Sequence, residues 1–120
     1  MNNSLNRVEP NQIAATTPIV DVRKHAGNRQ IRGAVRYDVG YLRAADRLVL
    51  PLPHSGPIAV YADSDAIANE IASLLRAAGY TGAAVLEGGF DAWRNAGLPV
   101  EELTQEQPIA GEPQAGLHDL

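Results

Sequence analysis

The stretch over residues 58–80 constrains the fold most strongly, because it joins an apolar strand to a helix through a short acidic loop. Residues 58–62 (IAVYA) are apolar throughout, as in a strand that is buried on both faces. Beyond the loop, apolar side chains recur at helical spacing and form one stripe: Ile67, Ile71, Leu74, Leu75 and Ala78. A buried strand that leads directly into an amphipathic helix is typical of a βαβ unit in a parallel sheet.

Both ends of this helix have clear signals. Asp63, Ser64 and Asp65 each suit the N-cap position, where a side-chain oxygen accepts a backbone N–H of the first turn. Gly79 suits the position just beyond the last turn, and Tyr80 is placed to pack back over that turn. Capping is therefore the ordinary role that we expect for the polar residues of the loop.

The rest of the chain continues the alternation of strands and helices. The other expected strands are residues 18–22, 34–39 and 83–87, and the other expected helices are residues 40–48 and 89–97. We expect residues 23–33 to form a loop with a helical turn, because glycines interrupt a polar run. The fold class that follows is α/β, with a central parallel sheet flanked by helices.

Three segments are expected along the chain. Residues 1–17 form an N-terminal lead-in, residues 18–101 form one folded domain, and residues 102–120 form a flexible acidic tail. The net charge of −4 arises in residues 101–120, which contain five acids and no lysine or arginine. The remaining body is close to neutral and offers no basic patch, so we expect no nucleic-acid partner.

Two absences narrow the possible functions. The chain has no apolar N-terminal signal and no run of about 18 apolar residues, so we expect no membrane partner and, by default, a cytoplasmic location. It also contains no cysteine, which excludes disulfides, thiolate metal ligands and every reaction that passes through a cysteine nucleophile. We expect neither a cofactor nor a bound metal.

The order of motifs resembles that of the rhodanese-like domain over residues 18–101. The motifs are IVDVR, IRGAV, IAVYA, LLRAAGY and VLEGGFDAWRNAGLPVE, of which the last is the most specific. The resemblance implies a small α/β fold with a central parallel sheet, and an active-site loop between the strand ending at Ala62 and the following helix. Rhodaneses move sulfane sulfur from an anionic donor such as thiosulfate, through a cysteine persulfide, to an acceptor.

The chain departs from the family pattern at the reactive loop, which in the family reads V-Y-C-x-x-G-x-R-S. Ala62 stands where the cysteine is expected, and Asp65, Ile67 and Ala68 replace the glycine, the arginine and the serine. The spacing from Ala62 to the Gly79–Tyr80 pair is that of the family, so the register is unchanged. Earlier in the chain, Gln30 and Arg32 stand at the family's histidine and proline positions.

The electrostatics of the loop change together with its nucleophile. A rhodanese loop holds a thiolate among backbone N–H groups at a helix N-terminus, which stabilises negative charge. Here the loop carries Asp63 and Asp65, which repel an anionic donor, and the next base after them is Arg76. Restoring the cysteine alone is therefore not expected to restore the reaction.

We interpret the chain as a non-catalytic rhodanese-homology module, an inactive homologue that binds a protein partner or has a regulatory role. The expected contact surface is the former active-site loop: Ala62, Asp63, Ser64, Asp65, Ala66, Ile67 and Ala68. Beneath it we expect a structural polar network of Asp21, Arg23 and Glu87, with Arg36 as a neighbour. The partner and the oligomeric state stay open.

One alternative is an enzyme of another type. A hydrolase-like reaction would use Asp63, Ser64 or Asp65, and it would require one of these groups to face an open pocket. A Ser-His-Asp arrangement would also require a nearby histidine. His25, His54 and His118 all lie in polar stretches, and we expect them on the solvated surface.

Overall fold

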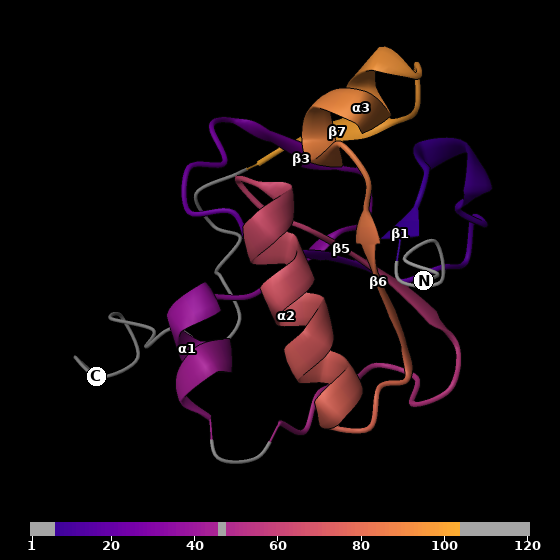
Figure 1. Cartoon of the computed structure of the whole chain (residues 1–120). Coiled ribbons are helices and arrows are strands. Elements are labelled where there is room, and N and C mark those ends of the chain that lie inside the picture. Colours follow the sequence, from indigo (N-terminus) through magenta and orange to yellow (C-terminus); the bar gives the residue numbers. More distant parts are fainter. Residues whose placement is uncertain (1–6, 46–47, 104–120) are drawn as a thin grey trace, which may run out of the picture.

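The computed structural model describes residues 7–45 and 48–103. Its central feature is a five-stranded sheet with the order β1-β6-β5-β2-β4, in which every neighbouring pair runs parallel (Figure 1). The strands are β1 (Arg7–Val8), β2 (Ile19–Asp21), β4 (Val35–Arg36), β5 (Pro57–Tyr61) and β6 (Gly82–Leu86). Helices cover both faces: α1 (Val39–Ala44) and α2 (Asp65–Ala77) on one, and α3 (Gly89–Asn95) on the other. The expected α/β class and central parallel sheet are confirmed.

β5 lies in the middle of the sheet because its side chains are apolar on both faces. Ile58 and Val60 belong to the hydrophobic cluster beneath α1 and α2, whereas Ala59 and Tyr61 belong to the cluster beneath α3. All four residues are at most 1% exposed. The alternation follows from the two-residue period of a strand, so a strand that serves two hydrophobic layers has no polar position between its ends.

α2 forms where the apolar stripe predicts it. Ile71 and Leu75 are fully buried, and Ile67, Leu74 and Ala78 pack at the edge of the same cluster. Ser64 is the N-cap, and its side chain accepts the backbone N–H of Ile67. The helix ends at Ala77 with Ala78 as its C-cap, and Gly79 follows with a positive φ of 107°, which few other residues adopt. The N–H groups of Gly79 and Tyr80 bond to the carbonyls of Arg76 and Leu75, which is a Schellman motif.

A second, antiparallel pair of strands was not expected from the sequence. β3 (Arg29–Ile31) lies in the segment interpreted as a loop, and it pairs with β7 (Val100–Glu102). Each strand has only three residues, too few to show a two-residue period. Each strand is stabilised by a partner about 70 residues away along the chain. The prediction of a loop was therefore wrong for residues 29–31, because no local sequence pattern indicates this pairing.

The N-terminal lead-in also contributes to the sheet. β1 forms its edge and pairs with β6, with Arg7 opposite Val85 and Val8 opposite Leu86. A short 3₁₀ helix, η2 (Pro10–Gln12), follows this strand. At the other end of the domain, residues 104–120 of the expected acidic tail lie outside the described residues, as does His118. Among the helices described, none is long and apolar enough to cross a membrane.

Candidate active-site loop

The loop after β5 lies at the carboxyl edge of the parallel sheet. β5 ends at Tyr61, Ala62 is 8% exposed, and α2 begins at Asp65. The segments that follow β2 and β6, the two neighbours of β5, come to the same edge because all three strands run parallel. In open parallel sheets this edge is where ligands and substrates bind.

A cavity of about 200 Å³ lies between these segments. The residues that line it come from the segment after β2, from the loop before α2 and from the start of α3: Arg23, His25, Ala62, Asp63, Ser64, Asp65, Gly88, Gly89, Phe90 and Asp91. Three of them are aspartates. The structure therefore brings four of the seven expected loop residues, Ala62 to Asp65, around one polar hollow. Of the other three, Ala66 is exposed, Ile67 packs at the edge of the core and Ala68 is buried in it.

Asp63 fastens the β5 loop to the segment after β2. Its carboxylate accepts the backbone N–H of Lys24 at 2.8 Å and that of His25 at 3.3 Å. Two hydrogen bonds to one carboxylate hold these segments together across 39 residues of sequence. Asp63 thus has a structural task other than the helix cap that we expected of it.

The other two polar loop residues also accept backbone N–H groups. Ser64 Oγ accepts from Ile67 at 3.2 Å and caps α2, as expected for this loop. Asp65 Oδ2 accepts from Gly88 at 3.1 Å and joins the start of α2 to the turn before α3. Gly88 has a φ of 78°, and a side chain there would meet the Cβ of Ala92 at 2.5 Å. The turn that offers its N–H to Asp65 therefore requires glycine.

Beneath the loop lies a buried charge pair. Asp21 is completely buried and Arg23 is 7% exposed, and Arg23 Nη2 lies 2.8 Å from Asp21 Oδ2. Arg23 Nε also donates to Asp21, at 3.1 Å. Burial alone lowers the pKa of Arg23, but the hydrogen bond and the charge of Asp21 outweigh it and raise this pKa above its ordinary value. The pair therefore favours the charged form of the Arg23 guanidinium.

Tyr61 extends this network into the sheet. Its hydroxyl donates to Asp21 Oδ2 at 2.8 Å and accepts the backbone N–H of Ile31 at 3.1 Å. Burial raises the pKa of Tyr61, and the nearby Asp21 carboxylate raises it further. Arg36 donates to the carbonyl of Arg23 at 3.0 Å, and its Nε lies 3.8 Å from Asp21. Sequence reasoning did not find Tyr61, although its position as the last residue of a buried strand was a usable signal.

The network limits what the cavity attracts. The guanidinium of Arg23 pairs with Asp21 and lies 4.8 Å from the ring centre of Phe90, so its positive charge is already neutralised. The cavity walls also carry Asp63, Asp65 and Asp91. Such a site repels an anion such as thiosulfate, because like charges at short range raise the free energy of the bound state.

Glu87 and the two histidines of the described residues lie apart from this network. The carboxylate of Glu87, predicted beside Asp21 and Arg23, pairs instead with Arg7 at 3.4 Å on the surface. His25 is exposed at the rim of the cavity, and His54 is exposed at the far end of α2, where its ring stacks on Tyr80. Within residues 7–45 and 48–103, no group of three or more His, Asp or Glu side chains is placed to hold a metal ion.

Comparison with known proteins agrees with this architecture. The solution structure of a rhodanese-like domain from Anabaena sp. shares 26% identity and a TM-score of 0.65, covering 91% of this chain and 88% of that one. A crystal structure of the Rhodanese_3 like domain of the same protein shares 31% identity and a TM-score of 0.60, covering 72% and 92%. Thiosulfate sulfurtransferase from Pseudomonas aeruginosa shares 26% identity and a TM-score of 0.64, covering 78% of this chain and 19% of that one.

A family model also matches most of the chain. Among curated proteins, no sequence matches the chain. The model of the rhodanese-like domain matches residues 5–96, which include all five strands of the parallel sheet and the three α-helices. With sheet, loop and family model in agreement, the chain belongs to the rhodanese-like domain family, as a member whose sequence contains no cysteine.

Proposed function

We propose that this chain is a non-catalytic rhodanese-like module that uses its former active-site loop to bind a protein partner. One observation carries the proposal: Asp63, Ser64 and Asp65 each accept a backbone N–H group from a neighbouring segment or from α2. A loop held in this way is a rigid, acidic surface. Rigid surfaces lose little conformational entropy on binding, which favours recognition.

The sequence supports the non-catalytic part of the proposal by its chemistry. Sulfur transfer through a persulfide needs a sulfur atom on the enzyme, and the chain contains no cysteine. The acidic wall of the cavity disfavours an anionic donor independently of the nucleophile. The hydrolase-like alternative loses its motivation, because its three candidate groups all serve as acceptors of backbone hydrogen bonds.

A capture experiment tests the proposed surface. Ala66 is exposed in the first turn of α2, and the substitution Ala66→Arg adds bulk and positive charge to the loop surface without removing a hydrogen bond. Ala96 is exposed just beyond the far end of α3, so Ala96→Arg makes the same chemical change away from the loop. The immobilised wild-type chain and both variants are compared against lysate of the source organism, with captured proteins quantified by mass spectrometry.

Comparing the two variants distinguishes binding at the loop from non-specific adsorption. We expect a small set of proteins to be captured by the wild type and by Ala96→Arg and to be lost with Ala66→Arg. Circular dichroism and thermal unfolding must show that both variants are folded. Equal capture by all three chains would contradict the assignment of the loop as the contact surface.

A further inference from the structure

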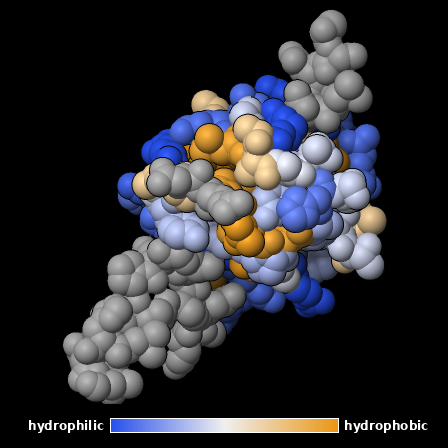
Figure 2. Space-filling model, turned by 90° about the horizontal axis from the view of Figure 1, so that it is seen from below, coloured by the Kyte–Doolittle hydropathy of each residue, from blue (hydrophilic) through white to orange (hydrophobic). Residues whose placement is uncertain are grey.

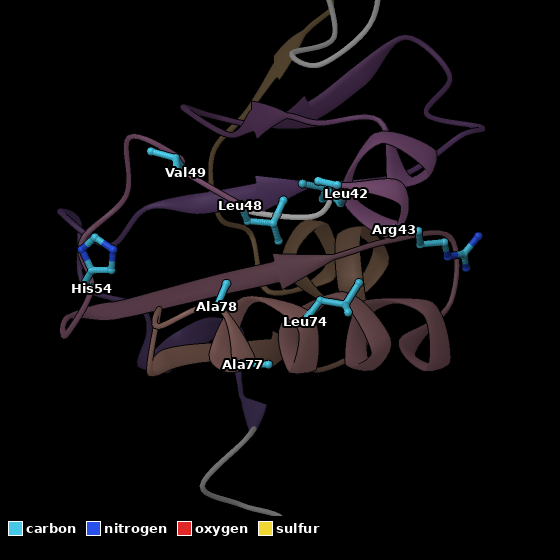
Figure 3. Close-up of a pocket in the computed structure, with 9 residues that line it drawn as sticks. Leu42, Arg43, Leu48, Val49, His54, Leu74, Ala77 and Ala78 are labelled. Carbon is cyan, nitrogen blue, oxygen red and sulfur yellow. The ribbon is translucent and has the colours of Figure 1, made fainter.

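Hydrophobic side chains gather near the middle of the lower face of the molecule, with hydrophilic residues around them (Figure 2). A groove of about 480 Å³ lies between α1 and the end of α2, and its lining includes Leu48 and Leu74 (Figure 3). Arg43 at this groove already forms a bidentate pair with Glu70, so its charge is not free to select a ligand. A second cavity, on the opposite face of the sheet, differs in this respect.

The second cavity has a volume of about 400 Å³ and lies on the face of the sheet that α3 covers. Its apolar walls come from residues 13–19, from α3 and from the turn after α3, and they include Ile13, Ile19, Trp93 and Leu98. Gly33 also lines the cavity, and a Cβ added there would meet no atom within 4 Å. Binding sites for small molecules are typically cavities of this size, with mostly apolar walls and a few polar groups.

Two parts of the cavity wall are held by the same carbonyl oxygen. Trp93 Nε1 donates to the carbonyl of Pro99 at 2.7 Å, and the backbone N–H of Arg32 donates to it at 3.2 Å. The indole ring and the backbone that carries the Arg32 side chain are therefore fixed relative to each other. A preformed site loses little conformational entropy when a ligand binds.

Arg32 is the only charged residue among the described residues that line this cavity. Its side chain is exposed, and within residues 7–45 and 48–103 it forms no ion pair. The carboxylate of Glu101 accepts the N–H of Gly33 but neither lines the cavity nor pairs with Arg32. Thr17 adds one hydroxyl to the lining. The cavity thus combines an apolar wall with one unpaired positive charge.

We propose that this cavity binds a small amphipathic monocarboxylate, with its apolar body against Trp93 and its carboxylate on Arg32. A guanidinium group offers paired N–H donors whose spacing matches the two oxygens of a carboxylate. Arg32 repels a cationic ligand, and a doubly negative ligand would keep one charge without a partner in the lining. Burial of the apolar body supplies affinity, and Arg32 supplies the selectivity for an acid. The cavity shares no residue with the hollow at the former active-site loop, so this inference does not rest on the proposed function.

Trp93 makes binding directly observable, because it is the only tryptophan of the chain and lies in the cavity wall. Its fluorescence is followed during titration with octanoate, octanol and octylamine, which share one alkyl chain, each below its critical micelle concentration. We expect a saturable change with octanoate, about fivefold weaker binding of octanol because it lacks the ion pair, and still weaker binding of octylamine. The net charge of −4 attracts the amine and repels the acid, so the overall charge does not produce a preference for octanoate.

Two substitutions that remove the same charge locate the head group. Arg32→Met should lower the affinity for octanoate to that for octanol. Arg29→Met should leave it unchanged, because Arg29 is exposed on β3 and does not line the cavity. Circular dichroism verifies that both variants are folded.

Three results would overturn the proposal. They are the absence of a saturable fluorescence change with octanoate, binding of octanol or octylamine as tight as that of octanoate, and a preference for octanoate that survives in Arg32→Met. None of these measurements involves a protein partner, so this proposal and the proposed function of the loop fail separately.

Discussion

The carboxylate of Asp63 accepts the backbone N–H of Lys24 at 2.8 Å, so the loop after β5 is fastened to the segment after β2. A second bond from His25 reinforces this connection. In a reactive loop the backbone N–H groups at this edge are available to stabilise a negatively charged ligand. Here a side chain of the protein itself accepts the N–H groups of Lys24 and His25, of which His25 lines the cavity.

Removing this carboxylate is expected to loosen the loop while leaving the fold intact. In Asp63→Ala the amides of Lys24 and His25 lose their acceptor, which costs about 1 kcal/mol of local stability, or about fivefold faster hydrogen exchange. Lys24 and His25 donate to different oxygens of Asp63, so Asp63→Asn, which keeps one acceptor oxygen, should leave only one of the two amides protected. Exchange rates of the two amides that are equal in Asp63→Ala and in the wild type would contradict this role.

Breaking the buried pair is expected to be far more damaging. Arg23→Met leaves the fully buried Asp21 carboxylate without its main partner, so the free energy of unfolding should fall by about 3–5 kcal/mol. Urea denaturation measures this change. The control is Arg94→Met, which removes an exposed ion pair with Asp91 and should change stability by less than about 1 kcal/mol. Similar losses of unfolding free energy in the two variants would contradict a larger contribution from the buried pair.

The Arg43–Glu70 pair gives stability a defined pH dependence. The hydrogen bond from Arg43 lowers the pKa of Glu70 below its ordinary value of 4.5. A carboxyl with a depressed folded-state pKa stabilises the protein fully above the unfolded-state pKa, and this contribution is lost as the pH falls through the folded-state pKa. We therefore expect the stability difference between the wild type and Glu70→Gln to be largest at neutral pH and to vanish in acid.

Thermal unfolding at a series of pH values measures this difference. Added salt should reduce it at neutral pH, because both side chains are exposed to solvent. Asp91→Asn is the comparison, since Asp91 also belongs to an exposed pair but one of longer distance, 3.3 Å. A stability difference for Glu70→Gln that grows toward acid pH would have the wrong sign for this pair.

Restoring the nucleophile alone is expected to leave the chain inactive. Ala62→Cys places a thiol at the end of β5, but Asp63, Asp65 and Asp91 still line the cavity and Arg23 is still neutralised by Asp21. Thiocyanate formation from thiosulfate and cyanide should stay at the rate of the buffer. Robust turnover by this single variant would show that the acidic wall does not control donor binding.

The parts of the fold that the sequence predicted are those with local signals. β5 and α2 have an apolar run and an apolar stripe within one window, and Ser64 and Gly79 mark the helix ends. β3 and β7 were not predicted, because strands of three residues are stabilised only by each other. Tertiary contacts decide such short elements, and no window along the chain contains both partners.

The candidate site was also predicted only in part from the sequence. The position of the loop and the pairing of Asp21 with Arg23 agree with what the sequence suggested, because strand ends and adjacent opposite charges are local features. The acceptor roles of Asp63 and Asp65 were out of reach, since their donors belong to Lys24 and Gly88 on other segments. Loop residues show no sequence periodicity from which hydrogen-bond partners on other segments could be predicted.

We propose that the loop after β5 is a contact surface and no longer a reaction centre. The most direct test is the rate of thiocyanate formation by the purified wild-type chain with thiosulfate and cyanide, measured over a range of protein concentrations beside an active rhodanese. We expect a rate equal to that of the buffer at every protein concentration, because the chain has no cysteine nucleophile and its cavity is acidic. A rate that rises in proportion to the protein concentration would contradict it.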